Sequence, residues 1–403
     1  MKILKQGACL VVFCLPLYLI RFEILKIPTT MLELLICALF ILWVFQGVHR
    51  SLWTVIKYER LLIWGVFLLF LGVSLATIFS WDAKTSAGIW KAWFVDPILF
   101  FMIFITVIKK EDVEDVFKSM ILSGFVVALI SLIYLICGNL NYQGRLQGVF
   151  NSPNYLAMYL AIPLLLSLGF FLRFPLERFL GNCLKGVNGT AKGAAWKTRG
   201  IYGVIFITIA VVLSFTQSFG ALLGIIGAVG LGAVFYLYQK NKKALALSLV
   251  VVGSAAILII GLIKIQSLEG LKSFDARFVI WKGAVNAFFE NPFTGIGPGT
   301  FEYYFPPYPK WGVPQPHNVF LAFLIQTGLP GFVGFILILI WFYKNNAKNL
   351  ALLCSMTYIL AHGLVDTTYW KNDLSVVFWI MIGITAVLQF YRIKSAVPFI
   401  HEK

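Results

Sequence analysis

The chain has 403 residues, and because 60% of them are hydrophobic and only 12% are charged, the composition excludes a water-soluble protein with an ordinary polar surface. A formal net charge of +16 indicates nucleic-acid binding only where the Lys and Arg side chains form one patch. Here they are scattered through short connectors, as in membrane proteins, so we expect no nucleic-acid partner and no second, soluble domain.

Apolar runs of about 18 to 25 residues, enough for a membrane-spanning helix, follow one another along the chain. They predict one all-α domain, residues 1–403, which is a polytopic integral membrane helical bundle of about twelve transmembrane helices. MKILK and the apolar run after it resemble a signal peptide without a cleavage site, so we expect a retained first span. The predicted spans are residues 6–20, 29–48, 61–79, 89–108, 117–137, 153–172, 201–218, 219–238, 244–263, 318–343, 349–366 and 374–391.

The basic residues favour one orientation of these spans. If the N-terminus is cytoplasmic, the cytoplasmic connectors contain about 22 Lys and Arg residues and the outer connectors about 11, in line with the positive-inside rule. Both termini are then cytoplasmic. We interpret the most basic connector, residues 173–200, as a cytoplasmic topology anchor, with contact to anionic lipid headgroups as the alternative.

The outer connector between the ninth and tenth spans, residues 264–317, is the longest, and a long ordered loop usually carries function. Its segment SFDARFVIWKGAVNAFFENP predicts a short amphipathic helix on the membrane surface, capped by Ser273 or Asp275. Arg277 then falls in the first turn, where a cation opposes the helix dipole and a bound phosphate would account for it. Pairing with Asp275 or with a lipid phosphate is the alternative. The predicted apolar face contains Phe278, Trp281, Val285, Phe288 and Phe289.

Other residues of the outer loops are also candidates for chemistry. His317 is the only histidine in an outer loop, and its imidazole can accept a proton from a hydroxyl near neutral pH, although a histidine at a helix start also serves as a cap. Arg145 lies before the sixth span, either as a second guanidinium for a diphosphate or as an interfacial side chain that reaches the headgroups. The aromatic and proline-rich segment 301–316 would stack on sugar rings or lie in the headgroup belt.

Ionisable residues inside the predicted spans usually face a cavity or a partner. His362 and Asp366 are four residues apart near the outer end of the eleventh span, so we expect them to share a helix face, with Asp366 orienting an imidazole or holding an arginine. Asp96 lies in the outer half of the fourth span. All three are predicted supporting residues. A transporter or lipid flippase, whose ion or substrate path they would form, is the alternative class of protein.

No metal site is expected. The cysteines lie without metal-ligand spacing, and the outer loops contain no DxD pair of carboxylates that would hold a divalent ion. A disulfide framework is not expected either, because the cysteines lie mostly in or beside apolar runs.

Three segments, GRLQGVFNSPN, RFVIWKGAVNAFFENPFTGIGPGTF and PHNVFLAFLIQTGLPG, resemble in order and spacing the O-antigen ligase and O-antigen polymerase superfamily. The resemblance covers residues 140–370 best. It implies a metal-independent glycosyltransferase without a cofactor, in the bacterial plasma (inner) membrane, that acts on the outer face. By motif position, Arg145 and Arg277 would bind the diphosphate of an undecaprenyl-diphosphate-linked glycan, and His317 would be the catalytic residue. Direct attack by the acceptor predicts inversion at the anomeric carbon.

The acceptor is the part of the function that these motifs leave open. We interpret the chain as an O-antigen ligase-like transferase, with an O-antigen or exopolysaccharide polymerase of the same superfamily as the alternative. The expected partners are the lipid-linked donor, the lipid bilayer, and an acceptor that is a glycolipid, a glycan or a protein.

Overall fold

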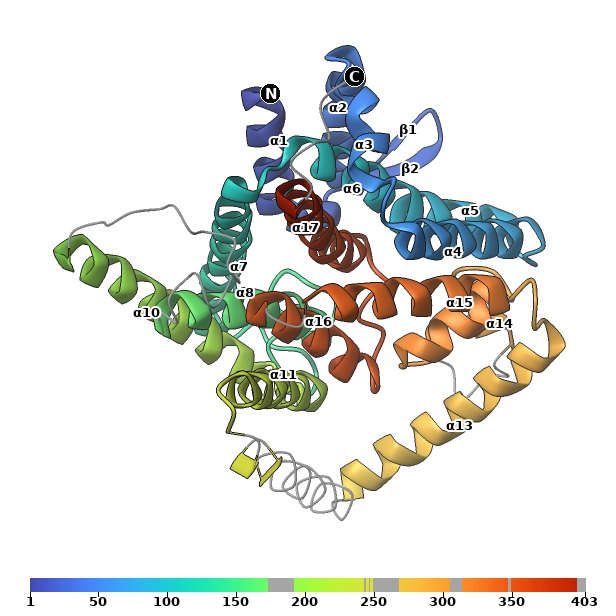
Figure 1. The fold of residues 1–403 in the computed structure, drawn as a ribbon. Coiled ribbons are helices and arrows are strands. Elements are labelled where there is room, and N and C mark those ends of the chain that lie inside the picture. The colour runs from blue at the N-terminus through green and yellow to red at the C-terminus, as the bar shows by residue number, and fades with distance from the viewer. Residues whose placement is uncertain are drawn as a thin grey trace.

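The computed structural model describes residues 1–172, 192–242, 244–245, 247–248, 268–304, 314–346 and 349–396, and helices dominate these parts of the chain (Figure 1). The helices of the first half are α1 (Lys2–Phe13), η1 (Leu15–Leu19), α2 (Met31–Phe45), η2 (Val48–Ser51), α3 (Leu52–Ile56), α4 (Arg60–Ile78), α5 (Ala83–Trp90), η3 (Lys91–Val95), α6 (Asp96–Val107), η4 (Lys110–Asp112) and α7 (Val113–Ile136). Those of the second half are α8 (Pro153–Leu172), α10 (Lys192–Phe215), α11 (Phe219–Gln239), α13 (Leu268–Glu290), α14 (Phe301–Tyr304), α15 (Val319–Asn346), α16 (Leu350–Gly363) and α17 (Asn372–Ala396).

Seven of the described helices are long and apolar enough to cross a membrane, or eight if the bent pair Met31–Phe45 and Val48–Ile56 forms one span. The apolar part of α10, Arg199–Phe215, and α16 are shorter. The ninth predicted span, residues 244–263, lies almost entirely outside the described residues. The chain is therefore a multi-span helical protein, and the count of about twelve spans stays a prediction.

The first predicted span, residues 6–20, is interrupted. Helix α1 ends at Phe13, and Pro16 lies in the first turn of the short helix η1, where the proline ring cannot continue the preceding hydrogen-bond ladder. Strand β1 (Arg21–Ile24) then pairs antiparallel with β2 (Ile27–Thr30). Leu25 and Lys26 between them have φ values of 50° and 65°, as a tight hairpin turn requires. The all-α prediction is thus wrong for this hairpin.

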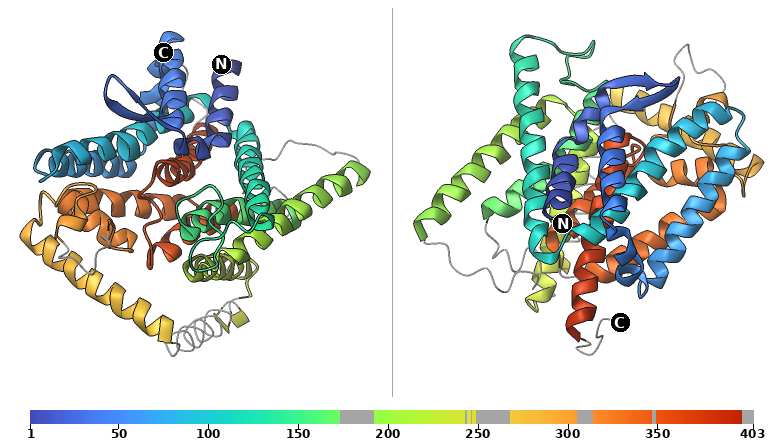
Figure 2. Two further views of the ribbon diagram at one scale, coloured as in Figure 1. Left: turned by 180° about the vertical axis from the view of Figure 1, so that it is seen from behind. Right: turned by 90° about the horizontal axis from the view of Figure 1, so that it is seen from above.

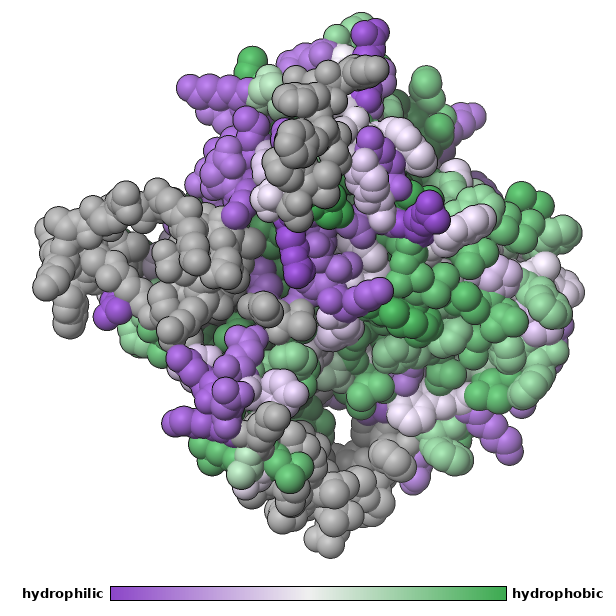
Figure 3. Space-filling model, in the orientation of Figure 1, coloured by the Kyte–Doolittle hydropathy of each residue, from purple (hydrophilic) through white to green (hydrophobic). Residues whose placement is uncertain are grey.

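Close backbone packing joins α4 to α15, and the two helices run side by side in Figures 1 and 2. A Cβ at Gly72 would collide with the backbone of Gly331, and one at Gly334 would collide with the backbone of Leu69. Figure 3 shows hydrophobic residues gathered over α4 and α15 on the outside of the molecule, where Trp64 and Phe67 of α4 are exposed. Such a continuous apolar surface suits contact with lipid.

Polar contacts join the helix ends that the topology predicts to be cytoplasmic. Lys5 Nζ lies 2.6 Å from the Asp112 carboxylate, beside the start of α7. At the end of α15, Trp341 Nε1 donates to Glu59 at 2.6 Å, and Asn345 Oδ1 accepts from Gln389 of α17 at 2.6 Å. The opposite helix ends, with their connectors, form the site described next.

Candidate active site

Helix α13 runs along an edge of the bundle in Figure 1. The described helix begins at Leu268, because the helix-forming residues of LEGLK extend it towards the N-terminus beyond the predicted start. Neither Ser273 nor Asp275 therefore caps its start, and Arg277 lies in its interior. The predicted first-turn position of Arg277 is therefore wrong, and the position of this side chain needs another explanation.

The buried face of α13 is narrower than the predicted apolar face. Small and branched side chains make up its contact with the loop and with α15, while Phe278 and Phe289 are 64% and 73% exposed. Phe278 and Phe289 thus extend mostly away from the protein, whereas Trp281 and Phe288 are partly buried against the packed cluster. The packed cluster consists of Ile280, Ala284, Ala287, Ile296, Phe301 and Ile325.

Two side-chain hydrogen bonds from α13 explain the position of Arg277. Arg277 Nε donates to the carbonyl oxygen of Val365 at 3.3 Å, and Trp281 Nε1 donates to that of Pro316 at 3.0 Å. Residues four apart share one face of a helix. This face of α13 therefore holds together the connector that carries Asp366 and the segment that carries His317.

The loop after α13 is also fixed, because it fits into a break in α15. Gly328 has φ 64° and ψ −179°, and a Cβ there would collide with the carbonyl of Phe293. The main-chain groups around the break bond with the loop: Leu329 N–H donates to Pro292 O, and Ile296 N–H donates to Ile325 O, both at 2.8 Å. A glycine is required at this position, since only glycine accepts positive φ and so close an approach without strain.

His317 and Asp366 form the centre of the site. His317 Nδ1 lies 3.2 Å from Asp366 Oδ1, and the imidazole is 39% exposed while the carboxylate is buried. Because an ionised carboxylate only accepts hydrogen bonds, Nδ1 is the donor of this bond, and in a neutral imidazole the lone pair is then on Nε2. The backbone of His317 has φ 48°, a left-handed conformation that costs a non-glycine residue about 1–2 kcal/mol.

The neighbouring Asn318 holds this conformation. Its Oδ1 accepts from the N–H groups of Phe320 and Leu321, both at 3.0 Å, and its Nδ2 donates to Leu364 O at 3.0 Å. Asn318 is thus the cap of α15, a role that was the alternative interpretation of His317. The His317 imidazole is left to contact Asp366.

Asp366 is ionised despite its burial. Burial alone would raise the pKa of its carboxyl, but the hydrogen bond and charge of His317, together with the N–H of Thr367, lower it to about 2. Thr367 N–H donates to Oδ1 at 2.8 Å, the oxygen that also faces His317. The second oxygen, Oδ2, accepts from Asn154 Nδ2 at 3.1 Å. Both oxygens are thus fixed in position.

Asn154 connects this carboxylate to Arg145. Arg145 Nη2 donates to Asn154 Oδ1 at 2.7 Å, and its Nε donates to Thr216 O, in the turn between α10 and α11, at 2.8 Å. Burial lowers the pKa of Arg145, although the charge of Asp366 opposes that effect. Arg145, His317, Asp366 and the backbone contact of Arg277 therefore lie together, although they come from three different connectors of the chain.

The other two predicted supporting residues differ in their relation to the site, because His362 is within electrostatic reach of Asp366 whereas Asp96 has other charged neighbours. Helix α16 ends at Gly363, so His362 and Asp366 do not share a helix face as predicted; Gly363 is crowded by Val319, and the chain turns there. His362 is buried, and its Nδ1 lies 2.8 Å from the hydroxyl of Tyr358. Asp96 is within electrostatic reach of Glu33 and Lys91, which form an ion pair of 2.7 Å on another part of the bundle.

Lys371, in the same connector as Asp366, was not predicted. Its ammonium lies 3.3 Å from the centre of the Tyr155 ring, is buried, and has no hydrogen-bond acceptor among the described residues. Burial lowers its pKa from 10.5 to about 8. A buried cation of this kind costs stability, which the contact with the aromatic ring offsets only in part.

We expect the thermal midpoint of unfolding to rise between pH 7.5 and pH 9.5 and Lys371→Met to abolish much of that rise. Below pH 8 the amine is charged in both states, so the folded protein bears the full cost of its burial. Between the folded pKa of about 8 and the unfolded value of 10.5 the unfolded chain binds more protons, so stability increases with pH. Thermal unfolding in detergent, followed by tryptophan fluorescence at both pH values, measures this. An equal rise in wild type and K371M would contradict it.

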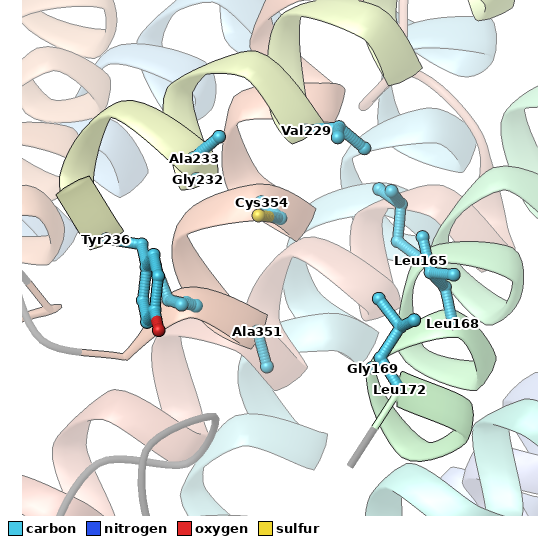
Figure 4. Close-up of a pocket in the computed structure, with 11 residues that line it drawn as sticks. Leu165, Leu168, Gly169, Leu172, Val229, Gly232, Ala233, Tyr236, Ala351 and Cys354 are labelled. Atoms are coloured by element: carbon cyan, nitrogen blue, oxygen red, sulfur yellow. The ribbon is translucent and has the colours of Figure 1, made fainter. Parts of the chain in front are cut away.

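An apolar pocket of about 230 Å³ lies at the other ends of α8 and α16, where they meet α11 (Figure 4). Its walls are aliphatic apart from the sulfur of Cys354 and the ring of Tyr236. Since none of the described residues that line it is charged, we do not assign the diphosphate to this pocket.

Part of the chain is similar to a known protein family. Residues 204–336 match a family described as O-antigen ligase, and this segment includes Arg277 and His317 but not Arg145 or Asp366. No curated protein matches the chain. The predicted relationship to the O-antigen ligase superfamily is confirmed by the match, over a shorter segment than the predicted 140–370. With its long apolar helices, the chain is a multi-span membrane protein, and its residues 204–336 are similar to the O-antigen ligase family.

Proposed function

We propose that this O-antigen ligase-like protein is a metal-independent, inverting glycosyltransferase that moves a glycan from undecaprenyl diphosphate to an acceptor hydroxyl on the outer face of the bacterial plasma membrane. The proposal takes its chemistry from the family relationship and its assignment of roles from the contacts around His317. Arg145 and Arg277 bind the donor diphosphate, and His317 is the catalytic residue.

In the proposed reaction the acceptor oxygen attacks the anomeric carbon of the lipid-linked glycan. The new carbon–oxygen bond forms as the bond from that carbon to the diphosphate oxygen breaks, and the leaving diphosphate keeps the electron pair. The acceptor proton passes to Nε2 of His317. Because the nucleophile enters opposite the leaving group, the anomeric configuration inverts.

The two arginines and Asp366 have separate tasks in this reaction. Negative charge grows on the diphosphate as it leaves, so guanidinium groups held in place beforehand stabilise the transition state more than the ground state. Asp366, which accepts from His317 Nδ1, keeps Nε2 available as the proton acceptor and stabilises the imidazolium that forms.

The observation that best supports the proposal is the meeting of predicted outer connectors at the His317–Asp366 pair. Arg145 joins the turn between α10 and α11, Asn154 joins Arg145 to Asp366, and α13 contacts both segments of the pair. All of these groups belong to segments that the positive-inside distribution assigns to the same side of the membrane.

A transfer assay tests the function directly. Purified protein in liposomes is supplied with an undecaprenyl-diphosphate-linked oligosaccharide and, separately, with a glycolipid acceptor, with a peptide acceptor, or with no acceptor other than a second donor molecule. We expect a lengthened acceptor of inverted anomeric configuration in one of these reactions. A product that contains two joined donor glycans would identify the polymerase, whereas transport of the donor without any product would identify the flippase alternative.

The same assay tests the independence from metal ions. We expect transfer to persist in EDTA, because the outer loops contain no DxD pair of carboxylates. Loss of transfer in EDTA, with recovery after Mg²⁺ is added, would contradict this part of the proposal.

A further inference from the structure

Asn154, the second residue of α8, contacts both an arginine of the proposed diphosphate site and the carboxylate beside the histidine. Its Oδ1 accepts from Arg145 Nη2 at 2.7 Å, and its Nδ2 donates to Asp366 Oδ2 at 3.1 Å. A guanidinium only donates and a carboxylate only accepts, so a single orientation of the amide satisfies both neighbours.

The Asp366 carboxylate, whose orientation is fixed in part by Asn154, in turn fixes the orientation of the His317 imidazole. Oδ1 is held by Thr367 N–H and His317 Nδ1, which leaves Oδ2 to Asn154. If Oδ2 loses its donor, the carboxylate can rotate, and the His317 ring is free to turn with it. A continuous series of hydrogen bonds thus leads from the Arg145 guanidinium through Asn154 and Asp366 to His317.

The Asn154 side chain is not needed to begin α8. Ser152 serves that purpose: its carbonyl accepts from Tyr155 and Leu156 N–H, and its Oγ accepts from the Asn154 N–H at 3.2 Å. Pro153 occupies the first helical position, which suits proline. A substitution of the Asn154 side chain therefore leaves the helix start intact and changes only the two contacts described above.

We propose that Asn154 is a positioning residue that couples the grip of Arg145 on the donor diphosphate to the orientation of His317. The inference rests on the proposed function and adds to it. A bound diphosphate attracts the Arg145 guanidinium and shifts its position. The Asn154 amide, which accepts from that guanidinium, then changes the position of the Asp366 carboxylate that holds the imidazole. Donor binding and activation of the acceptor hydroxyl are then linked rather than independent.

The first test measures transfer kinetics. Asn154→Ala should lower kcat by about 10- to 100-fold and should also raise the donor KM. Losses of about this size are usual when a residue that orients a functional side chain by a hydrogen bond is removed. Asn154→Asp should also be impaired, because a second carboxylate would repel Asp366. The matched control is Asn286→Ala, the same change at an exposed position of α13. Kinetics of N154A equal to those of wild type would overturn the proposal.

The second test does not depend on transfer. His317 is modified with diethyl pyrocarbonate, and its rate of modification is read from the peptide by mass spectrometry, with and without saturating undecaprenyl diphosphate. We expect bound undecaprenyl diphosphate to change the rate of His317 modification severalfold in wild type. In N154A protein that still binds undecaprenyl diphosphate, the rate should stay unchanged. An equal response in both proteins, or none in wild type, would overturn the coupling. Failure of the proposed function would instead appear as absence of transfer by wild type.

Discussion

His317→Ala is expected to lower kcat for glycan transfer by about a hundredfold to ten-thousandfold, the share that a general base contributes, while the donor KM changes little. The imidazole contacts Asp366, whereas Arg145 Nη2 donates to Asn154 and Arg277 Nε donates to Val365 O, so loss of the imidazole removes neither of these arginine contacts. Steady-state kinetics with a labelled lipid-linked donor measure both quantities.

Asp366→Asn should show a smaller fall in kcat, because the amide can still face Nδ1 but no longer stabilises an imidazolium.

A second histidine provides the control for that experiment. His49 lies in η2, in a connector predicted to be cytoplasmic, and its ring packs against Trp43. We expect His49→Ala to retain transfer within about twofold of wild type, as changes remote from a site usually do. If H317A protein is folded and monodisperse and still transfers glycan at the wild-type rate, His317 is not the base.

The helical, membrane-spanning class was predictable because it depends on composition and on the length of the apolar runs. The interruption of the first span was less evident, although Pro16 and the sequence RFEILKIPTT contained the signals for a helix end and a hairpin. The start of α13 was misplaced because Ser273 and Asp275 are good caps in general, while LEGLK before them also favours helix.

The candidate site was predictable as a set of residue types and not as a set of contacts. A single sequence indicates that Arg145, Arg277 and His317 are scarce polar groups on one predicted side. It cannot indicate that Arg277 and Trp281 donate to carbonyl oxygens beside Asp366 and His317, since those partners lie 88 and 35 residues away along the chain. Asn318 had a recognisable signal, an asparagine directly before an apolar helix. Asn154 and Lys371 had none, because their significance comes from residues distant in sequence.

Loss of either arginine should weaken use of the lipid-linked donor. Arg277→Ala and Arg145→Ala are each expected to lower kcat/KM for the donor by about a hundredfold to a thousandfold, the usual cost of removing one preorganised donor from a developing anion. Lys282→Ala, an exposed cation five residues further along α13, is the matched control and should keep kcat/KM within about twofold. A decrease of equal size in K282A would point to a general effect of surface charge.

Replacement by lysine separates charge from geometry. Each arginine uses Nε to hold itself to a backbone carbonyl, Arg277 to Val365 O and Arg145 to Thr216 O, and lysine has no equivalent of that donor. Each guanidinium is proposed to bond to the backbone and to the diphosphate at the same time. The kcat/KM values of Arg277→Lys and Arg145→Lys should then be nearly as low as those of the alanine variants. Affinity for undecaprenyl diphosphate, measured by titration without an acceptor, should fall in parallel. Lysine variants that retain both wild-type affinity and wild-type kcat/KM would mean that a diffuse positive charge is sufficient, and that the fixed geometry around Asp366 is not what selects the diphosphate.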